Sequence, residues 1–242
     1  MVAMAPTLVL LHGFTHTGQS WDPVVAGLGE RYRALAPDLR GHGAASERQP
    51  VTLEVVIDEV AGSGGEAFTL AGYSMGGRIA LHAALALPER VERLVLIGAS
   101  PGIADREERI ARRESDERLA DEIERSSIEE FARRWAATPM LADQLASVQA
   151  AAEADRLRNS PAGLAAALRG LGTGALPPVW DRLGELQMPV VLVVGDRDVK
   201  FRAIAEEMVE AIEHAKLVVV ANAGHAVHLE APNAVARAIA SG

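Results

Sequence analysis

Residues 66–80 have the sequence EAFTLAGYSMGGRIA, and this stretch decides the fold of the chain. Its first part, 66–71, is an apolar run typical of a short buried strand, and helix-forming residues follow Ser74. The serine lies within Gly72-Tyr73-Ser74-Met75-Gly76, and only glycine at the flanking positions lets a strand and a helix approach closely at a sharp turn. The pattern predicts a strand, a tight turn and a helix, with the Ser74 hydroxyl exposed above the sheet.

Similar apolar runs recur on both sides of this stretch. Further strands are predicted at 7–12, 31–37, 92–98, 188–195 and 216–221. Helical patterns lie between them, at 20–28, from Thr52 with its hydroxyl as the cap, around 204–212, and from Asn233. Strands that alternate with helices at this spacing predict an α/β fold with a mostly parallel sheet flanked by helices.

The alternation stops at Pro101. The segment that follows is rich in Arg, Glu and Ala, has almost no β-branched clusters, and predicts several helices. We therefore interpret 101–180 as a helical cap, inserted into an α/β core that comprises 1–100 and 181–242.

Composition excludes several kinds of partner and site. A formal net charge of -9 disfavours nonspecific attraction to nucleic acid or to an anionic membrane surface. No stretch approaches the roughly 18 apolar residues of a membrane span. Because cysteine is absent, disulfides and thiolate metal sites are impossible, and we expect a cytoplasmic protein. Arginine outnumbers lysine by 22 to 2, so a single arginine is weak evidence for anion binding.

Ligands of open parallel sheets bind beyond the carboxyl ends of the strands, so residues that directly follow strands are the candidates for chemistry. A serine hydroxyl needs a neighbouring imidazole to accept its proton and a carboxylate to fix the imidazole tautomer. These candidates include all three groups, in the chain order Ser, Asp, His. The full set is His12-Gly13-Phe14, Asp38, Ser74, Ser100, Asp196-Arg197-Asp198 and Gly224-His225.

Two of these positions have competitors nearby. Asp196 and Asp198 could each cap the helix that follows them. His225 and His228 are three residues apart, a spacing that also suits a metal pair on a helix, although no carboxylate or thiolate nearby completes such a site.

The order of these groups on this strand pattern resembles the α/β hydrolase superfamily, over residues 7–100 and 188–242. The resemblance implies a catalytic triad of Ser74, Asp198 and His225. It also implies an oxyanion hole made by the backbone N–H groups of Phe14 and Met75. We interpret His12 and His42 as structural residues of their loops.

Arg78 departs from a generic esterase. It lies four residues after Ser74, one turn along the same helix face, within the first turn, where the helix dipole disfavours a cation. A bound anion would compensate for that position. The alternative is an arginine that extends to solvent.

Five segments carry a second resemblance that covers almost the entire chain, cap included: GYSMGGRIAL, SPGIADREERIARRESDERLA, FARRW, RLRNSPAGLAAALRGLGTG and GDRDVKF. They resemble the 2-succinyl-6-hydroxy-2,4-cyclohexadiene-1-carboxylate synthases of menaquinone biosynthesis. The resemblance implies a lyase that eliminates pyruvate from a small substrate with three carboxylates, and it implies no metal and no organic cofactor.

The same resemblance implies which side chains bind the substrate. Arg78 matches the arginine of the core, Arg112 and Arg156 match those of the cap, and Trp135 and Tyr73 match aromatic positions of the pocket. The neighbours of the two cap arginines, Arg113 and Arg158, remain alternatives, and Glu108 could simply pair with Arg112.

Three functions remain open from the sequence. In the lyase, His225 and Asp198 make Ser74 a base that removes a proton beside the succinyl carbonyl, and no acyl-enzyme forms. In a carboxylic ester hydrolase, Ser74 would instead form an acyl-enzyme. A noncatalytic binding module on the same scaffold is the third, because a fold does not determine a function.

Overall fold

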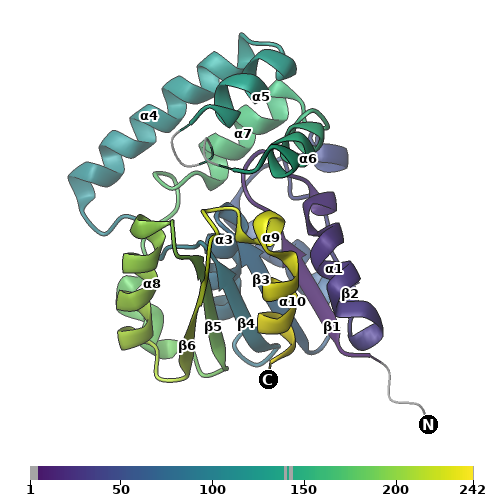
Figure 1. The fold of residues 1–242 in the computed structure, drawn as a ribbon. Coiled ribbons are helices and arrows are strands. Elements are labelled where there is room, and N and C mark those ends of the chain that lie inside the picture. Colours follow the sequence, from purple (N-terminus) through teal and green to yellow (C-terminus); the bar gives the residue numbers. More distant parts are fainter. Residues whose placement is uncertain (1–4, 139–140, 142–143, 242) are drawn as a thin grey trace.

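The computed structural model describes residues 5–138, 141 and 144–241. A six-stranded sheet in the order β2-β1-β3-β4-β5-β6 forms the centre of the molecule (Figure 1), and each pair of neighbouring strands is parallel. The predicted parallel sheet of an α/β fold is therefore confirmed. The strands are β1 (Thr7–Leu11), β2 (Arg33–Leu35), β3 (Phe68–Tyr73), β4 (Val91–Ile97), β5 (Val190–Gly195) and β6 (Ala215–Val220).

Helices cover both faces of the sheet, so the central strands are buried on both sides. One face packs on α2 (Leu53–Gly64), α3 (Met75–Ala86) and α8 (Val199–Ala211), and the other on α1 (Asp22–Leu28) and α10 (Pro232–Ala240). Successive residues of a strand point to opposite faces, so Leu8 and Leu10 belong to the second layer, whereas Val9 and Leu11 belong to the first. This double packing fixes the carboxyl ends of the strands, where the site lies.

Four helices between β4 and β5 lie above those carboxyl ends (Figure 1). They are α4 (Arg106–Glu124), α5 (Ile128–Ala136), α6 (Ala146–Arg156) and α7 (Pro161–Leu171). A small apolar core of their own includes Ile123, Phe131 and Leu164. The Val179 N–H donates to the Pro101 carbonyl at 2.9 Å, so the chain leaves this group of helices beside the point where it enters. The division at 101–180 stays a prediction.

Several boundaries differ from the sequence-based ones. The strand predicted at 31–37 is reduced to β2 at the edge of the sheet, and the helix predicted at 20–28 begins as a 3-10 turn, Gly18–Trp21, because Pro23 suits only the first turn of α1. Strand β3 extends beyond 66–71 to Tyr73. Short 3-10 turns (Gly29–Arg31, Gly43–Ala45 and Trp180–Glu185) and helix α9 (Val227–Glu230) were not predicted. Among the described residues, no helix has the length and apolarity to cross a membrane.

Candidate active site

The turn between β3 and α3 holds Ser74 in an unusual backbone conformation, with φ 52° and ψ −109°. A Cβ on Gly72 would lie 2.3 Å from the Gly76 carbonyl oxygen, and a Cβ on Gly76 would lie 2.2 Å from the Leu11 carbonyl oxygen. Both glycines are therefore required by close backbone contacts. A positive φ at a serine is a strained state that surrounding contacts must maintain, and it directs the hydroxyl out of the sheet.

Ser74, His225 and Asp198 lie in one hydrogen-bonded chain. The Ser74 Oγ is 3.1 Å from His225 Nε2, and His225 Nδ1 is 2.6 Å from the Asp198 carboxylate. Asp198 also accepts a 3.4 Å hydrogen bond from the Phe201 N–H at the start of α8. The carboxylate is therefore fixed on both sides, and it favours the tautomer in which His225 Nε2 accepts the serine proton.

The competing residues lie elsewhere. No hydrogen bond joins Asp196 to either histidine within the described part of the chain, whereas Asp198 both caps α8 and contacts His225. His228 is fully buried, and its ring packs 4.1 Å from that of Tyr73, centroid to centroid. Burial holds the pKa of His228 well below its ordinary value, so this imidazole is neutral.

Both predicted oxyanion-hole residues lie beside Ser74. Met75 is the first residue of α3, where an N–H has no acceptor within the helix. Phe14 follows Gly13, and a Cβ on Gly13 would lie 3.5 Å from the Ser74 Cβ. His12 braces this loop, since its Nε2 accepts from the Leu39 N–H at 2.9 Å and its Nδ1 lies 2.9 Å from the Gly13 carbonyl oxygen.

A cavity of about 220 Å³ lies over Ser74, between the sheet and the cap helices. It brings together residues from α3, α4, α5, α7 and α8 and from the loops that follow β1, β3, β4 and β6. The residues predicted for the site that line it are Phe14, Ser74, Met75, Arg78, Arg112, Trp135 and His225. Ser100 lines it too, whereas Asp38 instead accepts hydrogen bonds from the N–H groups of Gly18 and Ala44.

Arg78 is buried with no carboxylate partner among the described residues. It is 8% exposed, its Nη1 donates to the Thr173 hydroxyl, and its Nε has no partner. Burial, followed by the charge of Arg112, lowers the pKa of Arg78 to about 10, so the side chain is a cation at neutral pH. The Arg78 side chain does not extend to solvent, so the structure excludes the alternative that the sequence left open.

Arg112 also faces the cavity, but it is paired. Its Nε donates to Asp116 at 2.7 Å, and Asp116 in turn accepts from the Gly174 N–H at 3.3 Å. This pairing directs Arg112 toward the cavity. Arg113 is exposed, and Glu108 makes no ion pair with Arg112 in the described part of the chain.

Arg156 is a buried guanidinium of the cap that is not among the residues lining the cavity. It is 1% exposed, and none of its three guanidinium nitrogens has a hydrogen-bond partner among the described residues. Burial lowers the pKa of Arg156, while Tyr73 and Asp155 act in the opposite direction. Arg158 instead has a half-exposed side chain, 3.9 Å from Asp155. Geometry therefore favours Arg156 over Arg158.

The two predicted aromatic residues occupy different layers. Trp135 lines the cavity, with its ring 5.3 Å from that of Phe14. Tyr73 is 3% exposed and packs beside His225, ring centroids 5.3 Å apart, and burial raises the pKa of its phenol.

Lys200 was missed by the sequence analysis. It lines the cavity from the first turn of α8, two residues after Asp198, and it is the third cation there after Arg78 and Arg112. One signal could have found it, since it lies in the segment GDRDVKF that carries the second resemblance and is one of only 2 lysines. No group of three or more potential metal ligands occurs among the described residues.

Comparisons with known proteins cover the whole chain. Residues 8–238 match the model of the Alpha/beta hydrolase family. A Bacillus subtilis (strain 168) protein is 36% identical over 241 residues, 93% of this chain and 85% of the relative, and its name assigns it provisionally as a 2-succinyl-6-hydroxy-2,4-cyclohexadiene-1-carboxylate synthase. The synthase of that name from Salmonella paratyphi C (strain RKS4594) is 35% identical over 243 residues, 98% of this chain and 93% of the relative.

The solved structure of MenH from S. aureus has the same architecture. It matches with a TM-score of 0.92 and 30% sequence identity, over 99% of this chain and 94% of that one. The similarity extends over the sheet and the cap helices alike. Both resemblances inferred from the sequence motifs are confirmed by these comparisons.

Proposed function

The chain belongs to the alpha/beta hydrolase family, as an enzyme that acts on a small-molecule substrate, and we propose which reaction it catalyses. It eliminates pyruvate from 2-succinyl-5-enolpyruvyl-6-hydroxy-3-cyclohexene-1-carboxylate and gives 2-succinyl-6-hydroxy-2,4-cyclohexadiene-1-carboxylate, in cytoplasmic menaquinone biosynthesis. The observation that carries the proposal is Arg78, a buried guanidinium that has no carboxylate partner among the residues the structure describes and lies in the same cavity as Ser74. A neutral ester would leave that charge unpaired, whereas a polycarboxylate would neutralise it.

Ser74 is the base of this reaction. His225 accepts the Ser74 proton at Nε2, and Asp198 stabilises the imidazolium through Nδ1–H. The serine oxygen removes the proton on the carbon beside the succinyl carbonyl. The electrons released form a double bond between ring carbons 2 and 3, the existing double bond moves to carbons 4 and 5, the carbon 5–oxygen bond breaks, and the enolpyruvyl group leaves and is protonated to pyruvate. The proton returns from His225, so no group on the enzyme is consumed.

The oxyanion hole stabilises the charge that develops on the succinyl carbonyl oxygen. The N–H groups of Phe14 and Met75 are fixed by the loop after β1 and by the first turn of α3. A preorganised donor of this kind contributes about 3 kcal/mol to transition-state stabilisation. Because these donors bind a developing enolate as well as a tetrahedral oxyanion, they serve proton abstraction without an acyl-enzyme.

Four cations bind the carboxylates of the substrate. Arg78, Arg112 and Lys200 face the cavity, and Arg156 is the buried guanidinium of the cap. Trp135 supplies an apolar wall for the ring, and Tyr73 supports His225. The chemistry needs no metal and no organic cofactor, since the succinyl carbonyl of the substrate itself acidifies the proton that is removed.

The test is to mix the purified protein with the enolpyruvyl substrate and follow pyruvate by its coupled reduction with lactate dehydrogenase. We expect one pyruvate for each substrate consumed, with release abolished in Ser74→Ala. If the wild-type protein releases no pyruvate, the proposal is wrong.

Hydrolysis of a carboxylic ester is the second candidate. The Ser74 Oγ is 3.1 Å from His225 Nε2 beside two N–H donors, which suits covalent attack as well as proton abstraction. The two candidates differ in Arg78. Rapid turnover of neutral short-chain esters, undiminished by Arg78→Ala and accompanied by an acyl-enzyme in intact mass spectra, would favour the hydrolase.

A further inference from the structure

The last turn of α6 and the residues just after it carry a cluster of buried polar side chains. Asp155 is 7% exposed, Arg156 is 1% exposed and Asn159 is 6% exposed. Arg156 is already assigned to the substrate. The other two side chains point away from the cap and contact the loop that follows β1, which is the loop that carries Phe14.

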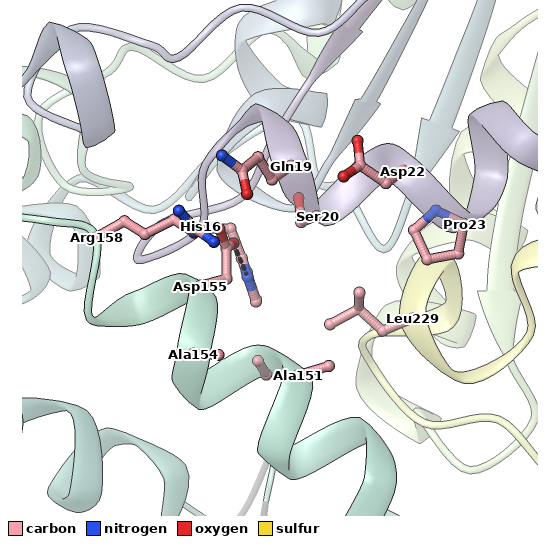
Figure 2. Close-up of a pocket in the computed structure, with 11 residues that line it drawn as sticks. His16, Gln19, Ser20, Asp22, Pro23, Ala151, Ala154, Asp155, Arg158 and Leu229 are labelled. Carbon is pink, nitrogen blue, oxygen red and sulfur yellow. Dashed lines mark hydrogen bonds and ion pairs between the residues drawn. The ribbon is translucent and has the colours of Figure 1, made fainter.

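Asp155 is bound by three groups of that loop. Its carboxylate accepts from the Thr17 N–H at 2.9 Å, from the Thr17 hydroxyl, and from His16 Nδ1 at 3.0 Å. Figure 2 shows His16 and Asp155 facing each other across the gap between the two segments. Burial lowers the pKa of His16, so a neutral ring donates the Nδ1 proton. Burial opposes ionisation of Asp155 as well, but the bonds from His16 and Thr17 outweigh it and its pKa is lowered.

Asn159 contacts the same loop at Thr15, the residue that follows Phe14. Its side-chain Nδ2 donates to the Thr15 carbonyl at 2.8 Å and to the Arg156 carbonyl at 3.1 Å. Its Oδ1 accepts from the Gly43 N–H at 3.0 Å. One amide therefore ties the cap to two separate loops of the core.

Thr15 needs such support. Its φ is +71°, a left-handed conformation that is strained for a β-branched residue, and its hydroxyl has no partner among the described residues. A strained residue persists only where its surroundings hold it. The Thr15 carbonyl is held by Asn159, and the N–H of Thr17, two residues later, is held by Asp155.

Phe14 directly precedes this strained residue. A displacement of about 1 Å of a catalytic group can cost 100-fold in rate. The position of the Phe14 N–H therefore depends on contacts from the cap at Thr15 and Thr17, in addition to those that His12 makes in the core.

We infer that Asp155 and Asn159 are positioning residues, which together form a clamp that sets the oxyanion-hole loop and makes its geometry depend on a seated cap. The inference rests on the proposed function. The turn that carries Arg156 to the substrate is the same turn that fixes the Phe14 N–H, so the binding of a carboxylate and the assembly of the oxyanion hole are linked through one short segment.

Two isosteric variants test the clamp by kinetics. Asn159→Asp keeps the acceptor for Gly43 but places a carboxylate oxygen against the Thr15 carbonyl, and Asp155→Asn removes the charge that His16 and Thr17 face. We expect kcat for pyruvate release to fall about 10- to 100-fold in each, with KM changed less than about threefold, because the substrate cations remain.

The controls separate positioning from folding. Glu153→Gln makes the same charge change as Asp155→Asn at an exposed site on the same helix, and we expect wild-type kcat. Thr17→Ser keeps both donors to Asp155 and should retain activity, whereas Thr17→Val should not. An unchanged kcat in both isosteric variants, or a loss that only follows the unfolded fraction, would overturn the inference.

Hydrogen exchange of the 13–17 segment gives a second readout that needs no substrate. Exchange should be faster in Asn159→Asp and Asp155→Asn than in the wild type, and unchanged in Glu153→Gln. If the wild-type protein releases no pyruvate, the proposed function fails, and exchange alone decides the clamp: faster exchange in the isosteric variants supports it, and unchanged exchange overturns it.

Discussion

Asp198 of the core and Arg156 of the cap differ in how their buried charges are satisfied. In the core, Asp198 is hydrogen-bonded to His225 and to the Phe201 N–H, so the charge is satisfied within the protein. In the cap, Arg156 is 1% exposed and its guanidinium has no partner in the described part of the chain. A buried charge without a partner is costly, so it persists only where function requires it. The triad of Ser74, His225 and Asp198 is thus assembled by the chain itself, whereas Arg156, like Arg78 of α3, is completed by an anionic ligand.

Removal of the core hydroxyl gives the largest expected effect on this comparison. Ser74→Ala should lower kcat for pyruvate release at least about 1,000-fold, since proton abstraction loses its base. His225→Ala should lower kcat by a similar factor. The double variant should have about the same kcat as the less active of the two single variants, because the two side chains act as a unit. Kinetics of all three variants, with melting curves to verify folding, provide the measurement. Asp196→Asn is the control, and a comparable loss there would return the acid role to Asp196.

Removal of the cap charge should separate activity from stability. Arg156→Met should lower kcat/KM about 100-fold, since a carboxylate of the substrate loses its partner. The same change should raise the free energy of unfolding by about 1–3 kcal/mol without substrate, because an unpaired charge is no longer buried. Asp198→Asn, in contrast, should lose both activity and stability.

Urea unfolding and pyruvate-release kinetics on the same preparations test this contrast. Arg158→Met is the matched control, because Arg158 lies on the same turn but has a half-exposed side chain. A destabilised Arg156→Met protein would mean that the guanidinium has a structural partner, and the contrast between core and cap would fail.

The same contrast explains which features could be predicted from the sequence. The turn at Ser74 was predictable because backbone contacts at Gly72 and Gly76 leave no other residue possible. Strand order indicated the loops of the acid and the histidine, and the family resemblance selected Asp198 and His225 within them. Cap side chains lie on helices, where neighbours in the sequence point to different sides and only tertiary packing selects one. Arg156 and Arg158 were therefore indistinguishable until their burial was known.

The contacts of Asp155 and Asn159 with the loop after β1 could not be predicted from the sequence for a related reason. In a segment rich in Arg and Glu, a carboxylate is usually part of a solvated helix face, and no local pattern indicates that it meets a loop 138 residues away. The edge strand β2 was overestimated because its pattern of apolar residues does not reveal that pairing ends at Leu35.

Acid sensitivity should belong to the core, because no histidine lies within 101–180. Burial lowers the pKa of His12 and that of His82 from 6.5 to about 4. Below pH 6.5 the unfolded chain binds protons at these rings while the folded chain stays neutral until about pH 4, so stability falls as the pH falls through that window. His82→Leu should remove roughly 2 kcal/mol of the loss between pH 7 and pH 4.5.

Urea unfolding at the two pH values measures this slope, with the exposed His214→Gln as the control. His82 Nε2 has no hydrogen-bond partner among the described residues, so the leucine breaks no contact at that atom. An undiminished slope in His82→Leu would place the acid sensitivity in other groups, and the cap would become a candidate for it.

The smallest effect concerns an arginine that is the opposite of Arg156. Arg169 of α7 contacts three carboxylates of α4, those of Glu117, Asp121 and Glu124, each at 2.7 Å. These bonds raise its pKa, but its side chain is 31% exposed, and water and salt screen such pairs.

Arg169→Ala should therefore lower the free energy of unfolding by only about 1 kcal/mol or less, and the difference should shrink in 1 M NaCl. Pyruvate release should stay at the wild-type rate, since none of the four side chains lines the cavity. A loss of several kcal/mol would show that the cap depends on its satisfied charges as the triad depends on Asp198, and within the cap the contrast with Asp198 would then hold for Arg156 alone.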